Sequence, residues 1–406
     1  MAGSVPSWVM PRFEPFAALH YAPGTDVDAV TAPPYDVIDA AQRAELAARS
    51  DANAVRFDLP DEADGPGRYD AAAALLDDLQ RRGVLVTDDA PSFYVYRMVY
   101  RDERGDERHT TGILGALTLS RPGEGDILPH EHTTPKAKSD RLDLLRSTRH
   151  NLSAIWGLSL AKGLTALCRT DGPADMVATD EDGVRHELWR LVDDDRIRAI
   201  AELVAGQPVV IADGHHRFET SLAYRDERRT VDGEGGDWDA TLAYVVELTD
   251  DELAVRPIHR LLHGTPRGTD LVDALGTTFF DVSTANDGDL TAQMEALGGL
   301  GLVLPNGDAY VLVPRPDAFP DDIPDLDSSR LDLAVSTLPN IDLEYQHGTE
   351  VILRRVRAGE ATAGVLLRPA TVSQIEATAH TGERMPPKTT FFWPKPRTGF
   401  VFRNLG

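Results

Sequence analysis

The chain of 406 residues contains little cysteine, little lysine and no long apolar run. Its single cysteine, Cys168, cannot form a disulfide within the chain, which is typical of proteins from a reducing compartment. The sequence predicts no membrane span, because it has no run of about 18 apolar residues. The start of the chain, Met1 to Phe16, lacks the basic and apolar regions of a signal peptide. We therefore expect a cytoplasmic protein.

Positive charge is also scarce, since 41 Lys and Arg stand against 66 Asp and Glu, for a net charge of −25. Sequence-independent nucleic-acid binding needs many cations against the phosphates, so we expect no DNA or RNA partner. A local cationic pocket for a small anion is compatible with this balance. The length predicts two or three domains, and 42% hydrophobic with 26% charged residues is globular composition.

Only five of the cationic residues are lysines, namely Lys136, Lys138, Lys162, Lys388 and Lys395. The abundance of Ala, Asp and Gly indicates a GC-rich codon bias, which replaces exchangeable lysines by arginine. We interpret the remaining lysines as enriched at positions where a compact ammonium group is needed. The alternative is that these five lysines have persisted by chance.

Strands and helices are predicted to alternate along the chain. Apolar periodicity predicts helices at residues 40–49, 70–82, 139–148, 193–205, 214–228, 290–297 and 371–380. Strands are predicted at 93–101, 109–119, 154–160, 208–212 and 241–248, with a hairpin near 302–313 around Asn306-Gly307. This order predicts an α/β protein, with α+β as the alternative. We place a core domain at residues 1–262 and a C-terminal α/β domain at 263–406, whose tail packs back on the core.

The most specific segment follows the apolar strand 208–212 and reads Asp213-Gly-His-His-Arg217. A strand, a tight turn and a helix start are predicted, and the first N–H groups of a helix attract anions such as phosphate. Gly214 allows an anion to approach the backbone closely, while the side chains of His215, His216 and Arg217 add hydrogen-bond donors. Asp213 is a candidate for Mg²⁺ binding or for orienting a hydroxyl; a plain helix cap is the alternative. The spacing is neither a P-loop nor a Rossmann fingerprint.

A second polar segment, residues 128–141, combines a carboxylate, imidazoles and two of the rare lysines. We interpret Glu131 as a general base for a substrate hydroxyl, and Lys136 and Arg141 as groups that neutralise phosphate charge. A metal site is an alternative, formed by His130, His132, His215 and His216, although the His-Glu-x-x-His spacing is absent. A solvated loop is the third reading.

Three further segments carry weaker candidates. Tyr35 and Asp36 follow two prolines that fix the backbone, and either a structural turn or a substrate site fits. His259 and Arg260 are candidates for contact with an anion, with a structural ion pair as the alternative. Lys388 precedes an aromatic run near the chain end, which is typical of a docked last strand.

These segments together resemble the bacterial and archaeal family known as domain of unknown function 1015. The resemblance rests on Pro33-Pro-Tyr-Asp-Val-Ile, Leu128-Pro-His-Glu, Ala212-Asp-Gly-His-His-Arg-Phe-Glu-Thr, Pro257-Ile-His-Arg and Met385-Pro-Pro-Lys-Thr-Thr-Phe-Phe-Trp-Pro-Lys-Pro. They occur in order along almost the whole chain, but the family name implies no activity.

The segment Asp213–Arg217 is also similar to the nucleotide-phosphate motif of the ParB/sulfiredoxin superfamily, which includes ParB partition proteins, sulfiredoxins and free-serine kinases. Sulfiredoxins carry a reactive cysteine after the glycine, where this chain has His215, so peroxiredoxin repair is not expected. The DNA-binding region of ParB is not expected either, because of the acidic charge. The serine-kinase branch shares Asp-Gly-His-His-Arg itself. The resemblance implies a mixed sheet core with a ParB/sulfiredoxin-like nucleotide site.

Residues and resemblance together predict a nucleotide-dependent phosphotransferase acting on a small hydroxyl metabolite such as free L-serine, with Mg²⁺ and ATP or ADP. The predicted catalytic residues are Glu131, Asp213 and His216, with Asp213 also the metal ligand. The predicted phosphate ligands are Gly214, His215, Arg217, Lys136, Arg141 and Lys388. The predicted substrate ligands are Tyr35, Asp36, His130, His259 and Arg260. A metal-dependent hydrolase or phosphatase and a nucleotide-binding regulator without turnover are the alternatives. For the C-terminal third, three roles are alternatives: a lid, a homodimer surface or a substrate domain.

Overall fold

The computed structural model describes residues 11–102, 105–121, 123–125, 127–129, 138–264, 270–286, 288–381, 385–386 and 388–406. The chain divides into two compact units. The first comprises the described residues of Met1–Pro129, Thr133–Ala254 and Pro394–Gly406, and the second those of Val255–Trp393. Residues 255–262 therefore group with the second unit, and the last residues of the chain group with the first. The division into a core domain at 1–262 and a C-terminal domain at 263–406 stays a prediction.

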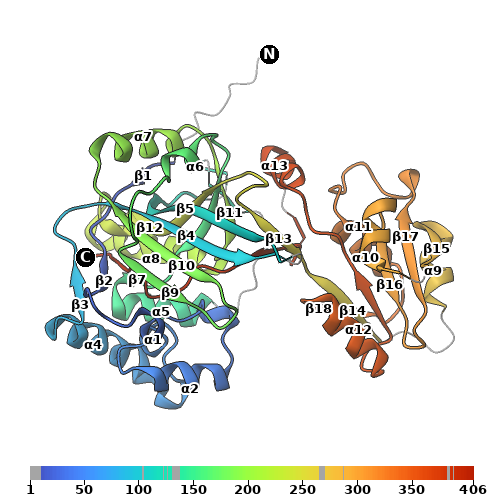
Figure 1. The fold of residues 1–406 in the computed structure, drawn as a ribbon, viewed down its shortest axis with the longest axis horizontal. Helices are drawn as coiled ribbons and strands as arrows, with labels where there is room; N and C mark the ends of the chain where they lie inside the picture. Colours follow the sequence, from blue (N-terminus) through green and yellow to red (C-terminus); the bar gives the residue numbers. More distant parts are fainter. Residues whose placement is uncertain are drawn as a thin grey trace. The chain divides into compact units, whose positions relative to one another are not determined.

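The first unit is built on a mixed nine-stranded sheet (Figure 1). Its strands are β1 Phe13–Glu14, β4 Phe93–Arg101, β5 Glu107–Thr118, β6 Ile127–Pro129, β8 Ile155–Ser159, β9 Met176–Thr179, β10 Arg185–Leu191, β11 Val209–Asp213 and β12 Ala240–Glu247. The order is β6-β11-β8-β12-β5-β4-β10-β9, and β1 also pairs with β5. The pairs β6–β11 and β8–β12 are parallel and the others are antiparallel. The predicted mixed sheet is confirmed.

Eight α-helices are described in this unit, and those predicted from periodicity lie within a few residues of their expected bounds. They are α1 Val27–Val30, α2 Ala40–Arg49, α3 Val55–Asp58, α4 Arg68–Arg81, α5 Lys138–Thr148, α6 Leu164–Leu167, α7 Asp194–Ala205 and α8 His215–Asp232. Two short ladders complete the unit: β2 Leu19–Tyr21 with β3 Leu85–Thr87, and β7 His150–Asn151 with β21 Arg403–Asn404.

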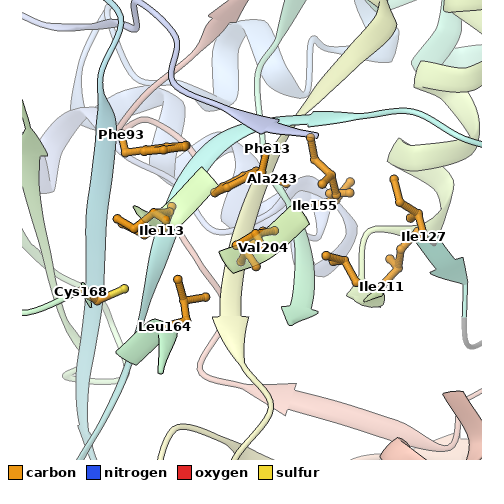
Figure 2. Packing of buried hydrophobic residues seen from close by; sticks show 14 of the residues in the cluster. Phe13, Phe93, Ile113, Ile127, Ile155, Leu164, Cys168, Val204, Ile211 and Ala243 are labelled. Atoms are coloured by element: carbon orange, nitrogen blue, oxygen red, sulfur yellow. The ribbon is translucent and has the colours of Figure 1, made fainter. Parts of the chain in front are cut away.

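The alternation along β4 explains why both faces of the sheet are buried. Phe93 belongs to a core cluster with Phe13, and their rings stack at 4.9 Å (Figure 2). Every second residue, Tyr94 and Tyr96 among them, points to the opposite face, because side chains alternate with a period of two. There the Tyr96 ring meets Phe400 of the chain end edge-on at 5.1 Å. The end of the chain therefore covers one face of the sheet.

Cys168 lies in the same core cluster and is 1% exposed (Figure 2). Burial raises the pKa of its thiol to about 12. A buried thiol with a raised pKa is a poor nucleophile, so the predicted inert role is supported.

The second unit contains a six-stranded antiparallel sheet of order β15-β17-β16-β19-β14-β18. Its strands are β14 His259–His263, β15 Phe280–Thr284, β16 Leu300–Val303, β17 Ala309–Pro314, β18 Asp342–Gln346 and β19 Ala363–Leu366, and β13 Ala254–Pro257 pairs separately with β20 Thr390–Trp393. Its helices are α9 Leu271–Thr278, α10 Leu290–Leu297, α11 Asp327–Ser336, α12 Thr349–Arg357 and α13 Val372–Thr381. The predicted hairpin is confirmed as β16–β17. The antiparallel sheet corrects the predicted α/β layout of this part to α+β.

No helix in the described part of the chain is long and apolar enough to cross a membrane.

The close approach of β5 and β12 generates a stability prediction at Gly112. A methyl group there would lie 2.5 Å from the Val245 carbonyl oxygen and 2.7 Å from Val246 Cγ2. We expect Gly112→Ala to lower the free energy of unfolding by about 1–3 kcal/mol, because backbone must shift to admit it. The control is Gly67→Ala, whose added methyl meets nothing within 4 Å and whose φ is −76°. Equal denaturation midpoints for the two variants would contradict this packing.

Candidate functional site

The predicted strand, turn and helix around Asp213 are confirmed. β11 is apolar and ends at Asp213, and α8 begins at His215 and runs for 18 residues. Gly214 between them has φ 83° and ψ 29°, a left-handed conformation that favours glycine. A Cβ there would approach the Arg217 guanidinium to 3.0 Å. The first N–H groups of α8 receive no side-chain cap from Gly214, so the helix start offers backbone donors and its positive dipole end.

Asp213 is held between two cations. Its Oδ2 accepts a hydrogen bond from Arg217 Nη2 at 2.8 Å, and its Oδ1 contacts the Lys395 ammonium. The three side chains are largely buried, with exposed fractions of 16%, 11% and 14% for Asp213, Arg217 and Lys395. Burial alone would raise the pKa of Asp213, but Lys395 and Arg217 oppose it and lower this pKa to about 2. Asp213 is therefore ionised at neutral pH.

Lys395 was not among the predicted site residues, although the scarcity of lysine drew attention to it. It lies 182 positions from Asp213 and belongs to the stretch that returns to the first unit. No local spacing relates two residues so far apart, so only the rarity of lysine pointed toward Lys395.

Arg141 and Tyr35 come together beside Arg217. The Arg141 guanidinium lies 4.1 Å from the centre of the Tyr35 ring, within cation–π distance. Arg141 Nη1 also faces Asp58 Oδ1 at 3.4 Å, and burial raises the pKa of Asp58 although Arg141 opposes this. Asp58 was not predicted, because its short helix α3 reads as an ordinary charged segment. The four side chains line one cavity of about 50 Å³.

The remaining predicted residues of this unit are placed as follows. Asp36 is exposed next to Tyr35. His215 and His216 occupy the first turn of α8, and His216 Nε2 is buried without a hydrogen-bond partner among the described residues. His130, Glu131 and Lys136 lie outside the described residues. The preceding strand β6 ends at Pro129, which pairs with Ile211 two residues before Asp213.

His259, Arg260 and Lys388 belong to the second unit. His259 Nδ1 accepts from the Leu367 N–H at 3.1 Å, and its Nε2 lies 3.2 Å from Thr349 Oγ1. Burial and then Arg260 lower the pKa of His259 to about 4, so its ring is neutral. Arg260 is fully buried and donates to the Ile258 carbonyl at 2.5 Å. These contacts favour structural roles for His259 and Arg260, and their part in substrate binding stays a prediction.

Lys388 is exposed and has a φ of 60°, unusual for a residue with a side chain. Its role as a phosphate ligand likewise stays a prediction.

The geometry does not fit Asp213 as a metal ligand, because cations hold both of its carboxylate oxygens. Within the described ranges, no group of three His, Cys, Asp or Glu side chains converges on a metal-sized site. Magnesium binding by Asp213 stays a prediction, and these contacts do not favour it. The alternative histidine site includes His130 and His132, which lie outside the described residues.

Residues 13–334 match the family described as "Protein of unknown function (DUF1015)", and the chain belongs to this family. No curated protein matches its sequence.

Several solved structures are distantly similar. A conserved hypothetical protein from Pyrococcus furiosus is 14% identical, with a TM-score of 0.35, covering 67% of this chain and 88% of that one. Free serine kinase in complex with AMP is 15% identical, with a TM-score of 0.36, covering 69% and 88%. SbnI from Staphylococcus aureus, truncated at its C-terminus, is 12% identical, with a TM-score of 0.38, covering 71% and 86%. A variant of free serine kinase in complex with ADP is also similar, at 15% identity and a TM-score of 0.37. These scores are too low to carry an argument about function.

The ion cluster makes stability depend on pH in a defined direction. The lowered pKa of Asp213 means that its ionised form stabilises the fold above its ordinary pKa, and that this contribution is lost as the pH falls toward 2. We expect Lys395→Met to cost about 3 kcal/mol at pH 7, the low end of the range for breaking a buried pair, because Arg217 remains. The difference from the wild type should narrow below about pH 4, as Asp213 is protonated.

Urea unfolding between pH 7 and 3 measures this difference. The control is Lys162→Met, since the Lys162 ammonium donates to the neutral Leu248 carbonyl at 2.7 Å. Its stability difference should not change over the same pH range. Parallel profiles for the two variants would mean that Lys395 does not set the ionisation of Asp213.

Proposed function

We propose that this protein is a nucleotide-dependent phosphotransferase for a small hydroxyl metabolite, with free L-serine as the first candidate acceptor. The observation that carries the proposal is the start of α8, where backbone donors lie beside Arg217 and Lys395. Phosphoryl transfer depends mainly on positioning and on neutralising phosphate charge, which such a site supplies. The similarity of Asp213–Arg217 to the motif of free-serine kinases supports serine as the acceptor.

The donor phosphates are assigned to the N-terminus of α8. Gly214 has no side chain, so an oxyanion can approach the backbone closely, and the helix dipole favours its charge. Arg217 and Lys395 add two cations within contact of Asp213. Asp213 acts in this proposal as a positioning residue, because it holds both cations at the helix start.

Glu131 is proposed as the base that accepts the proton of the acceptor hydroxyl, with Lys136 neutralising the transferred group. The segment that contains them follows β6, which runs parallel to β11. The carboxyl ends of neighbouring parallel strands lie at the same edge of a sheet. The chain therefore leaves β6 at the same edge of the sheet at which β11 ends with Asp213.

Magnesium accompanies ATP in solution, but the oxygens of Asp213 do not fit as its ligands. The proposed roles of this chain's residues are to bind phosphate, to orient the acceptor and to take up its proton.

Nucleotide binding is tested by thermal unfolding of the full chain with ATP, ADP, CTP and GTP. A nucleotide at tenfold its Kd should stabilise the protein by about 1.4 kcal/mol and raise Tm. We expect Arg217→Ala to lose this shift. Arg228→Ala is the matched control, because Arg228 lies on the same helix and pairs with Asp232 at 2.8 Å. A shift that persists in Arg217→Ala, or its absence with every nucleotide in a folded sample, would exclude the phosphate site.

Turnover is tested separately with Glu131→Gln. We expect the formation of O-phosphoserine, followed by mass spectrometry, to fall by roughly 10²- to 10⁴-fold, because the general base is lost. Nucleotide binding should be retained. Glu124→Gln, an exposed glutamate outside the segment, serves as the control. A Glu131→Gln enzyme with undiminished rate would exclude the general-base role, and no turnover even by the wild type would favour the regulatory alternative.

A further inference from the structure

The small cavity beside Arg217 is distinct from the helix start assigned to the donor phosphates. Its volume of about 50 Å³ holds a few water-sized groups and is far below that of pockets for drug-sized ligands. Its lining includes Tyr35, Asp58 and Arg141, together with Arg217 and residues of the second turn of α8. Such a space suits one functional group of a small metabolite, and not a nucleoside.

Three side chains of the cavity wall have unused hydrogen-bonding capacity. Arg141 Nη2, Arg217 Nε and Thr220 Oγ1 are buried, and none has a hydrogen-bond partner in the part of the chain that the structure describes. Arg141 is 7% exposed and Thr220 is 5% exposed. Buried donors without acceptors are rare in folded proteins, and their concentration at one cavity indicates an acceptor that comes from a ligand.

Other polar groups of the same wall are bonded within the fold. Asn151 Oδ1 accepts from the Leu242 N–H at 2.9 Å, His150 Nδ1 lies 2.6 Å from the Thr148 carbonyl, and Ser221 donates to the Arg217 carbonyl at 2.9 Å. Among the described residues that line the cavity, the fully buried polar atoms without a partner belong to one hydroxyl and two guanidinium groups.

The bonds that Arg141 does make are long. Its nitrogens lie 3.4 Å from Asp58 and 3.3 Å from Asp140, whereas charge-assisted bonds are usually about 2.7–2.9 Å. A buried arginine held this loosely is not a saturated structural ion pair. It retains the capacity to bind a second anion.

The charge balance defines the kind of anion. Four cations, Arg141, Arg217, Lys395 and Arg68, face three carboxylates, Asp58, Asp213 and Asp140. Asp140 is shared, because it lies 3.3 Å from Arg141 and 2.8 Å from Arg68. The exposed Asp36 is screened by solvent. One positive charge is left over, which matches a monoanion better than a phosphate dianion. A planar carboxylate also matches the geometry of a guanidinium fork.

We propose that this cavity binds the carboxylate of the acceptor amino acid, with Arg141 and Thr220 as its ligands. The proposal rests on the proposed function for the identity of the acceptor, and it assigns Arg141 to the acceptor instead of the donor phosphate. It defines the substrate class as α-amino acids that carry a hydroxyl, and it excludes amino alcohols that lack the carboxylate.

The test uses the full chain and two variants, Thr220→Val and Arg141→Met. Thr220→Val exchanges a hydroxyl for a methyl group of the same shape, so a purely structural Thr220 would leave ligand binding unchanged. The matched control is Thr110→Val, because Thr110 is likewise fully buried with an unpartnered hydroxyl but does not line the cavity. Calorimetric titration with L-serine and with ethanolamine, which is serine without its carboxylate, measures binding without turnover.

We expect L-serine to bind the wild type and Thr110→Val equally, and ethanolamine to bind neither. Arg141→Met should weaken L-serine binding by roughly 10- to 100-fold, and Thr220→Val by roughly 3- to 10-fold, typical of a charge-assisted and a neutral hydrogen bond. The Kd for nucleotide should change less than twofold in both variants.

Equal binding of ethanolamine and L-serine would overturn the proposal, as would unchanged L-serine binding by Thr220→Val and Arg141→Met. Loss of nucleotide binding in these variants, with L-serine binding intact, would assign the cavity to a donor phosphate and also overturn it. If L-serine binds as expected but no nucleotide phosphorylates it, the proposed function fails and the carboxylate site stands.

Discussion

The ion cluster of Asp213, Arg217 and Lys395 is the interaction on which the candidate site depends. A carboxylate at the end of a buried strand is stable in ionised form only when cations offset the loss of water around it. Arg217 supplies one cation from the first turn of α8, and Lys395 supplies the other from the end of the chain. The same contacts hold both cations at the N-terminus of the helix, where backbone donors are available. Stability and the proposed anion binding are therefore linked through one carboxylate.

The chain end brings Lys395 to this cluster and is anchored just after it. Arg397 is 8% exposed; its N–H donates to the Tyr96 hydroxyl at 3.0 Å and its Nε to Thr31 Oγ1 at 3.0 Å. Farther along, β21 pairs with β7. These contacts fix the backbone around Lys395, so its ammonium is directed by the fold and does not depend on a flexible tail.

The sequence predicted those features of the structure that depend on a few adjacent residues. The apolar strand ending in Asp213-Gly214 predicted a turn and a helix start, because the change from apolar to polar residues and the glycine all lie within a few positions. The hairpin at Asn306-Gly307 was predictable for the same reason. Burial of Cys168 followed from its apolar neighbours.

Contacts between distant segments were not predictable. Tyr35 and Arg141 were each identified, but no periodicity indicates that a guanidinium will lie over that ring. Asp58 reads as a surface residue, and only packing against Arg141 and Thr398 buries it. His259 and Arg260 read as a polar pair for a site, although they lie in a strand whose residues are mostly buried. The pattern of one strand cannot reveal which elements will cover it.

Hydrogen–deuterium exchange at the start of α8, with and without ATP, tests the central claim most directly. The first-turn amides of an α-helix have no carbonyl partner earlier in the helix. In α8 the Phe218 N–H donates to the Gly214 carbonyl at 2.9 Å. If phosphate binds there, ATP should slow exchange at these first amides and leave the later turns of α8 unchanged. Unchanged exchange at the first turn under saturating ATP, or protection confined to another part of the chain, would contradict the account.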